Sequence, residues 1–145
     1  MEELIQKENI DVNVNAKHWE DAIRKAGQLL INSKRIEEDY IDCMIDSVKE
    51  LGPYIVISQG FALAHAAPNI KMVHEPSLSM VTLEKPIEFG SPNDPVKVVM
   101  CLACTDKATH LDLLSKVAKK LMKENYIEDV AKCTSIEELY RVING

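Results

Sequence analysis

The first thirty residues contain two different patterns of apolar positions. Residues 10–14 alternate between apolar and polar side chains, which is the period-two pattern of a half-buried strand. From Trp19 to Leu30, apolar residues recur at spacings of three and four, which predicts an amphipathic helix with one buried stripe. We expect Asn15 to cap this helix or to precede its cap, and His18 to lie at its solvated start.

A second helix is predicted over Glu37–Leu51, where apolar residues again follow helical spacing. Gly52-Pro53 ends it, because glycine favours the conformation that follows a helix and proline cannot continue one. Tyr54–Ile57 is then predicted as a strand from its β-branched and aromatic residues. Phe61–Ala64 is a further short extended segment, and it leads directly into His65.

The middle of the chain predicts two more strands with a loop between them. Ser79–Leu83 has the composition of a strand. Residues 85–95 are rich in turn-forming residues and predict a surface loop, with a short edge pairing near Ile87 and Phe89. The strand over 96–103 is almost entirely apolar, so we expect it in the middle of the sheet, with both of its faces covered.

The last third of the chain predicts helices. The first of them has Asp106 or Thr109 as its cap, which places His110 in its first turn. A short helix is expected over 126–132. The last helix begins at Thr134-Ser135, where a hydroxyl residue followed three positions later by glutamate forms a capping box.

This order of elements predicts an α/β fold in which a mixed β-sheet is sandwiched between helices. The chain has 145 residues, of which 46% are hydrophobic, and this length suits one core. We therefore expect a single domain over residues 1–145.

Charge and hydropathy exclude several classes of partner. The formal net charge is −6 and the lysines and arginines are dispersed, which argues against binding of nucleic acid. No apolar stretch is long enough for direct membrane insertion, and the start at Met1-Glu2-Glu3-Leu4 is too acidic for a signal peptide. We therefore expect a cytoplasmic protein.

Four cysteines occur, and two of them have the C-x-x-C spacing, Cys101 and Cys104. A redox pair of this kind needs a helix N-terminus to lower the thiol pKa. Here the pair belongs to a predicted buried strand, in which residues three apart face opposite sides. We expect reduced, buried thiols instead, and no zinc site, because no second pair has ligand spacing.

The candidate chemistry lies in two histidines, His65 after the Gly60 turn and His110 in the first turn of a helix. An imidazole nitrogen is a competent nucleophile near neutral pH. A helix N-terminus attracts anions, and the hydroxyl of Thr109 adds a candidate phosphate-binding group. Our hypothesis is that both rings face one phosphoryl group that His65 carries covalently. The alternatives are that each histidine simply packs and hydrogen-bonds a neighbour, that Thr109 only caps its helix, or that the two rings hold a metal ion.

No nucleotide-binding loop of the G-x-x-x-x-G-K-[ST] or G-x-G-x-x-G type occurs, and no carboxylate cluster suggests a magnesium site. We therefore expect no cofactor and no resident metal. Transfer between proteins asks mainly for positioning and for stabilisation of the phosphoryl oxygens, which amides and an imidazole supply.

The chain resembles the enzyme IIA proteins of the phosphoenolpyruvate-dependent sugar phosphotransferase system (PTS), of the mannitol/fructose type, and most of all the ascorbate-specific ones. The resemblance covers nearly the whole chain and rests on four motifs in the right order. The first is LGPYIVI (51–57) together with GFALAH (60–65), the second is LEKPIEF (83–89), the third is NDPV (93–96), and the fourth is THL (109–111) together with LL (113–114).

The resemblance implies a mannitol-type IIA fold and a role in sugar transport. It implies that His65 accepts a phosphoryl group from the phosphocarrier protein HPr and passes it to a cysteine of a IIB protein. IIB then phosphorylates the sugar brought in by the membrane component IIC. His110 matches the histidine that stabilises the phosphoryl group in the family, and ascorbate is the expected substrate.

Two positions depart from the family pattern. Ala64 stands where proline commonly precedes the active histidine, and Ala67 stands where ascorbate-type proteins often have arginine. Lys71 or Lys107 is a candidate for the missing charge, with a solvated surface lysine as the alternative. The departures also motivate a second hypothesis, a regulatory interaction module that keeps the fold with little or no transfer activity. His74 is expected at the surface.

Overall fold

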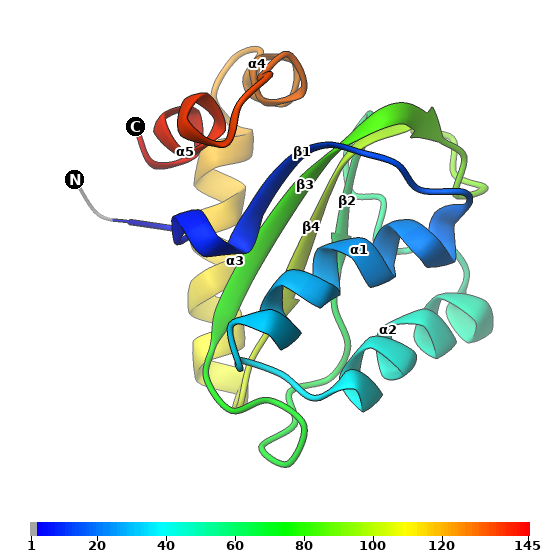
Figure 1. The fold of residues 1–145 in the computed structure, drawn as a ribbon. Helices are drawn as coiled ribbons and strands as arrows, with labels where there is room; N and C mark the ends of the chain where they lie inside the picture. Colours follow the sequence, from blue (N-terminus) through cyan, green and yellow to red (C-terminus); the bar gives the residue numbers. More distant parts are fainter. Residues whose placement is uncertain (1–2) are drawn as a thin grey trace.

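A four-stranded mixed sheet lies at the centre of the computed structural model, which describes residues 3–145 (Figure 1). The strand order is β1-β3-β4-β2, where β1 is Ile10–Val14, β2 is Phe61–Ala64, β3 is Ser77–Ile87 and β4 is Val96–Ala103. The pairs β1–β3 and β2–β4 are parallel, whereas β3 and β4 are antiparallel. This confirms the predicted mixture of strand directions and the interior position of 96–103.

The predicted absence of a signal peptide concerns in part Met1 and Glu2, which lie outside the described residues.

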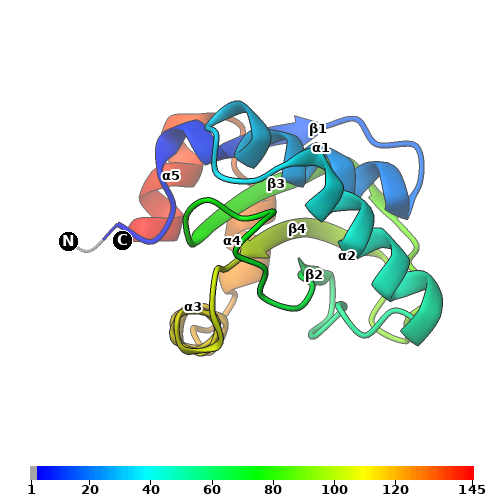
Figure 2. The ribbon, with the colours of Figure 1, turned by 90° about the horizontal axis from the view of Figure 1, so that it is seen from below.

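Helices cover both faces of this sheet, as Figure 2 shows in a view from below. One face packs against α1 (Trp19–Asn32) and α2 (Glu38–Leu51). The other face packs against α3 (Lys107–Leu121), α4 (Tyr126–Ala131) and α5 (Ile136–Asn144). The predicted α/β sandwich is therefore confirmed.

The two faces of β4 belong to two separate hydrophobic cores because successive residues of a strand point to opposite sides. Val99, Cys101 and Ala103 pack with α1 and α2. Met100 and Leu102, and Cys104 just after the strand, pack with the helices of the other face. The strand is buried along almost all of its length, as the apolar run predicted. Cys101 and Cys104 lie in different cores and are free thiols.

The helix starts follow local side-chain chemistry. Asp106 caps α3 by accepting the Thr109 N–H, and Ser135 caps α5 by accepting the Glu138 N–H. Both were among the predicted caps. Of the two alternatives for Asn15, the cap of α1 is wrong and a place before the cap is what the structure has, because the cap is His18, whose Nδ1 accepts the Asp21 N–H. His18 is exposed, as expected.

The predicted strand over Tyr54–Ile57 is wrong, and this segment forms a turn. Gly52 adopts a positive φ of 87°, and the Tyr54 N–H then donates to the Gly52 carbonyl. A left-handed glycine followed by Pro53 reverses the chain, and this turn chemistry prevails over the weak strand preference of four residues. Ile55 remains fully buried beneath the turn.

The strand β3 is longer than predicted, since it continues through part of the expected loop to Ile87. Its pairing with β4 is irregular between Thr82 and Ile87, and Ile87 pairs with Val96. The expected pairing near Ile87 is therefore confirmed, but it belongs to β3, an interior strand, and not to a separate edge segment. Phe89 lies outside the strand, and its N–H donates to the Asp94 carboxylate.

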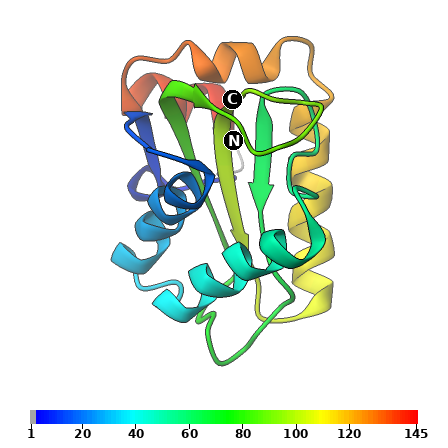
Figure 3. The ribbon, with the colours of Figure 1, turned by 90° about the vertical axis from the view of Figure 1, so that its right-hand side faces the viewer.

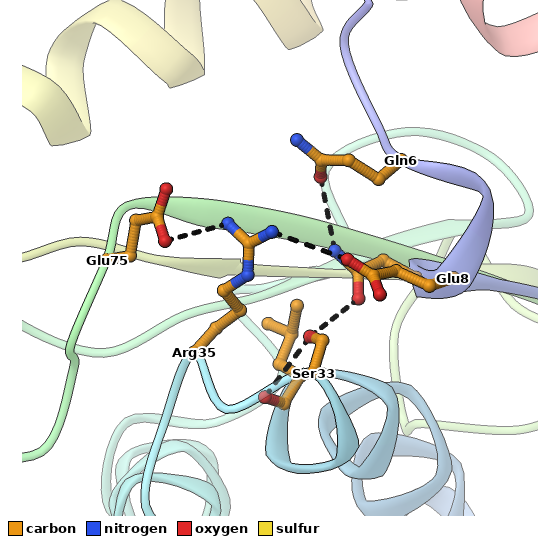
Figure 4. A network of polar contacts seen from close by, with 7 residues as sticks. Gln6, Glu8, Ser33, Arg35 and Glu75 are labelled. Atoms are coloured by element: carbon orange, nitrogen blue, oxygen red, sulfur yellow. Dashed lines mark hydrogen bonds and ion pairs between the residues drawn. The ribbon is translucent and has the colours of Figure 1, made fainter.

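A polar network ties the short 3₁₀ helix η1 (Lys7–Asn9) to the segment after α1 (Figure 4). Arg35 lies between the carboxylates of Glu8 and Glu75, at 3.4 and 3.1 Å. The Arg35 carbonyl also accepts the His74 N–H, and Ile36 forms a β-bridge with Val73. The far end of the segment that follows His65 is therefore anchored to the residues between α1 and α2.

Candidate functional site

The two candidate histidines meet at one edge of the sheet. His65 directly follows β2, and α3 begins a few residues after β4. Because β2 and β4 are parallel neighbours, with Ala64 opposite Cys101, both lead to the same end of the sheet, as Figure 3 shows. The ring centroids of His65 and His110 lie 5.7 Å apart, with the ring planes inclined by 60°.

The imidazole of His65 has a defined orientation. Its Nδ1 lies 2.7 Å from the Leu63 carbonyl oxygen. A carbonyl oxygen can only accept, so Nδ1 must carry the proton of this hydrogen bond. In the neutral ring this leaves the lone pair on Nε2. The half-buried side chain therefore offers Nε2 as its nucleophilic atom.

Two tyrosine hydroxyls hold the main chain around His65. Tyr54 donates to the His65 carbonyl at 2.8 Å, and its ring meets the imidazole edge-on with centroids 5.2 Å apart. The buried Tyr40 of α2 donates to the Ala66 carbonyl at 3.1 Å and accepts the Ala66 N–H at 3.3 Å. The chain that leaves β2 is thus fixed by side chains rather than by a strand partner.

His110 is half-buried, in the first turn of α3 as predicted. Its Nδ1 is buried without a hydrogen-bond partner among residues 3–145. Burial lowers the pKa of His110 below its ordinary value, and the nearby His65 lowers it further. The ring is therefore held in its neutral form in the absence of an anion, and Nε2 is the nitrogen available to a bound group.

The hydroxyl of Thr109 takes part in the cap of α3. It donates within the cap, with the Asp106 carbonyl oxygen and carboxylate oxygen both at 3.1 Å. The Asp106 carboxylate accepts hydrogen bonds from the Thr109 backbone N–H and from the Thr109 hydroxyl. These two hydrogen bonds, the backbone one most of all, hold the pKa of Asp106 below its usual value. A negative carboxylate therefore offsets part of the positive end of the helix dipole. A phosphoryl oxygen accepts hydrogen bonds, so Thr109 would have to turn the hydrogen of its hydroxyl away from Asp106 to contact one. Its phosphate-binding role therefore stays a prediction.

Of the remaining candidates, none is joined to the two rings by a described contact. Lys71 and Lys107 are exposed. His74 is exposed, as expected, and its Nε2 lies 2.9 Å from a Glu37 carboxylate oxygen. Within residues 3–145 no group of three His, Cys, Asp or Glu side chains is arranged to hold a metal ion.

Exposed apolar side chains occur on each segment that carries or contacts the histidines. Tyr54 is 37% exposed, Ile70 follows His65 in the loop and is 77% exposed, and Leu111 follows His110 and is 57% exposed. The Asn69 N–H donates to the Cys104 carbonyl, which brings the loop after His65 against the end of β4. Exposed apolar side chains near a site are candidates for contact with another macromolecule. No helix within the described part of the chain is long and apolar enough to cross a bilayer.

Sequence reasoning missed Tyr54 and Tyr40 as members of this site. Tyr54 was assigned to a strand and Tyr40 to the buried face of α2. The sequence could have indicated a polar role for Tyr40, because a tyrosine on a buried helix face needs a hydrogen-bond partner for its hydroxyl. The identity of that partner is not visible in the sequence.

Comparison with known proteins gives consistent matches over the whole chain. The model of the family described as "Phosphoenolpyruvate-dependent sugar phosphotransferase system, EIIA 2" matches residues 3–145. The ascorbate-specific PTS system EIIA component of Escherichia coli K12 is 29% identical over 143 residues, which cover 97% of this chain and 92% of the relative.

Solved structures show the same fold. The solution structure of the mannitol-specific cryptic phosphotransferase enzyme IIA CmtB from Escherichia coli has a TM-score of 0.87, 26% identity, and coverage of 98% of both chains. The crystal structure of IIA mannitol from Escherichia coli has a TM-score of 0.82 at 24% identity, covering 96% of this chain and 98% of that one.

Proposed function

The chain belongs to the EIIA 2 family of the phosphoenolpyruvate-dependent sugar phosphotransferase system, and on that premise we propose that it is a phosphocarrier that uses His65 as phosphoryl acceptor and His110 as stabiliser. The observation that carries this proposal is the pair of imidazoles, 5.7 Å apart, with Nδ1 of His65 engaged by a carbonyl and Nε2 left as nucleophile.

The proposed reaction consists of two in-line displacements. In the first, the Nε2 lone pair of His65 attacks the phosphorus of phospho-HPr, a P–N bond forms, and the bond to the donor group of HPr breaks. In the second, a IIB cysteine thiolate attacks the same phosphorus, a P–S bond forms, and the electron pair returns to Nε2. His110 contacts the phosphoryl oxygens, which carry the charge in both transition states.

The carbonyl of Leu63 has a specific part in this scheme. A phosphoryl group on Nε2 leaves the ring with its remaining proton on Nδ1, where the carbonyl at 2.7 Å accepts it. The same hydrogen bond therefore serves the free and the phosphorylated ring, and the imidazole does not have to turn over during the cycle. This preorganisation favours rapid transfer in both directions.

We propose HPr as the phosphoryl donor, IIB as the acceptor, and through IIB the membrane component IIC as the transporter that the chain serves in the cytoplasm. The exposed apolar residues Ile70, in the loop after His65, and Leu111, next to His110 in the chain, offer contact area for these partners in turn. The ascorbate-specific relative at 29% identity supports ascorbate as the transported substrate.

Intact mass spectrometry tests the proposal. The chain is incubated with phosphoenolpyruvate, enzyme I and HPr, and we expect one acid-labile phosphoryl group that is lost in His65→Ala. His74→Ala is the matched control, since His74 is an exposed histidine paired with Glu37. A wild-type chain that gains no phosphate, or a His65→Ala variant that gains it normally, contradicts the proposal.

The second candidate function is a regulatory interaction module without effective transfer. It is favoured by Ala64 and Ala67, the two departures from the family pattern. Phosphorylation of a IIB cysteine at a rate that depends on His65 would exclude it. Neighbouring IIB and IIC genes would favour transport, whereas a neighbouring regulator alone would favour regulation.

A further inference from the structure

Tyr54 occupies an unusual place beside the nucleophile, because it contacts both the main chain and the ring of His65. Its hydroxyl donates to the His65 carbonyl at 2.8 Å. Its ring stands nearly perpendicular to the imidazole, at 89°, with the centroids 5.2 Å apart. An edge-to-face pair of this kind is a favourable and directional contact between aromatic rings.

The turn that carries Tyr54 is itself firmly placed. The neighbouring Ile55 is fully buried, and its carbonyl accepts the Leu63 N–H at 2.8 Å. The Leu63 carbonyl in turn accepts the proton on Nδ1 of His65. The turn, the end of β2 and the imidazole are therefore joined by consecutive hydrogen bonds in one small unit.

The imidazole thus has two ring neighbours, Tyr54 with its centroid at 5.2 Å and His110 at 5.7 Å. Rotation about the side-chain bonds of His65 would break the hydrogen bond from Nδ1 to the Leu63 carbonyl and change the contacts with both rings. A tyrosine hydroxyl is protonated at neutral pH and able to donate, and burial raises the pKa of Tyr54 further above its ordinary value of 10.0.

We propose that Tyr54 is a positioning residue for phosphoryl transfer: its ring holds the His65 imidazole and its hydroxyl holds the His65 carbonyl, which together keep Nε2 directed at the incoming phosphorus. This inference rests on the proposed function of His65. In this proposal Tyr54 acts through His65, because its hydroxyl is engaged by the His65 carbonyl. Misplacement of a reacting atom by about 1 Å can cost about 100-fold in rate, so a residue that only positions the nucleophile has a large effect.

Two variants separate the hydroxyl from the ring. Tyr54→Phe keeps the edge-to-face contact and loses the hydrogen bond, and we expect transfer from phospho-HPr to slow by about 3-fold. Tyr54→Leu loses both the edge-to-face contact and the hydrogen bond, and we expect the maximal rate to fall by about 10-fold or more. The phospho-HPr concentration that gives half of the maximal rate should change little. Tyr140→Phe, which removes a hydroxyl contact with Glu3 remote from both histidines, is the control and should transfer normally.

NMR of the imidazole nitrogens and ring protons of His65, assigned by their loss in His65→Ala, provides a readout that needs no phosphoryl transfer. In Tyr54→Leu we expect loss of the ring-current shift from the tyrosine and a mixture of the two neutral tautomers, while Tyr54→Phe keeps the shift. Should the leucine variant fail to fold, Tyr54→Phe decides by its rate of transfer from phospho-HPr.

Wild-type rates and unaltered His65 resonances in every folded Tyr54 variant would overturn the proposal. A rise only in the half-saturating HPr concentration would also overturn it, because Tyr54 would then be a docking residue. A wild-type chain that accepts no phosphate would refute the proposed function instead, and the His65 spectra would still test the placement of the ring.

Discussion

His65 and His110 face each other across the end of the sheet with their ring centroids 5.7 Å apart. The two residues are 45 positions apart in the chain and come from different elements, the end of β2 and the first turn of α3. Their different surroundings suggest different roles. His65 has Nδ1 engaged and Nε2 free, whereas His110 is held neutral by burial and by its neighbour.

His110→Ala should separate acceptance of the phosphoryl group from its delivery. We expect the variant to gain phosphate on His65 but to pass it to IIB about 100-fold more slowly, because one contact to the charged oxygens is lost in the transition state. Rapid-quench measurement of both steps checks this. Equal and mild effects of His65→Ala and His110→Ala would contradict the assignment of roles.

The pKa of His110 should respond to phosphorylation. In the free protein burial and the nearby His65 keep it below the ordinary value of 6.5. A phosphoryl dianion on His65 is an opposite charge to the imidazolium, so it should raise the pKa of His110. Titration of the His110 ring protons by NMR before and after phosphorylation measures both values. An unchanged pKa would show that His110 does not contact the phosphoryl group.

The same lowered pKa predicts how stability depends on pH. Because folded His110 binds its proton less readily than the unfolded chain does, the unfolded state holds more protons as the pH falls from above 6.5. The contribution of His110 to stability is therefore fully present above the pKa of the unfolded chain. It is lost as the pH falls through the lower pKa of the folded protein. We expect the midpoint of thermal unfolding to fall more steeply with acidification in the wild type than in His110→Gln. Parallel curves for the two proteins would refute this prediction.

The four thiols should differ sharply in reactivity. Burial raises the pKa of Cys101 to about 12 and also raises those of Cys104 and Cys133. Cys43 is only half-buried. We expect an alkylating reagent to modify Cys43 first in the native protein, with the other three reacting only after unfolding, as followed by peptide mass mapping. A disulfide between Cys101 and Cys104 would contradict their placement in separate cores.

Tyr40→Phe should destabilise the fold near the site. It removes the hydroxyl that serves both the N–H and the carbonyl of the buried Ala66. Leaving such groups unpaired costs about 1–3 kcal/mol, so we expect the free energy of unfolding to fall by that amount. Urea denaturation measures it, with Tyr140→Phe as the control for loss of an exposed hydroxyl. Equal stabilities of the two variants would argue against the role of Tyr40.

The sequence by itself determined the elements whose cause is local. The alternation over 10–14 and the helical spacing in α1 and α2 reflect which side chains must be buried, and this periodicity is visible in any one segment. The cap by Asp106 placed His110 in the first turn of α3, because a cap and its helix are a few residues apart.

Only the tertiary structure decided that His65 and His110 meet. Their proximity depends on the parallel pairing of β2 with β4, and strand order is a non-local choice that periodicity does not encode. It also decided that Tyr54 stands beside the imidazole, because the turn at Gly52 keeps 54–57 out of the sheet and brings the Tyr54 hydroxyl to the His65 carbonyl. Local patterns specify which residues are buried, whereas the packing of distant segments specifies which of them touch.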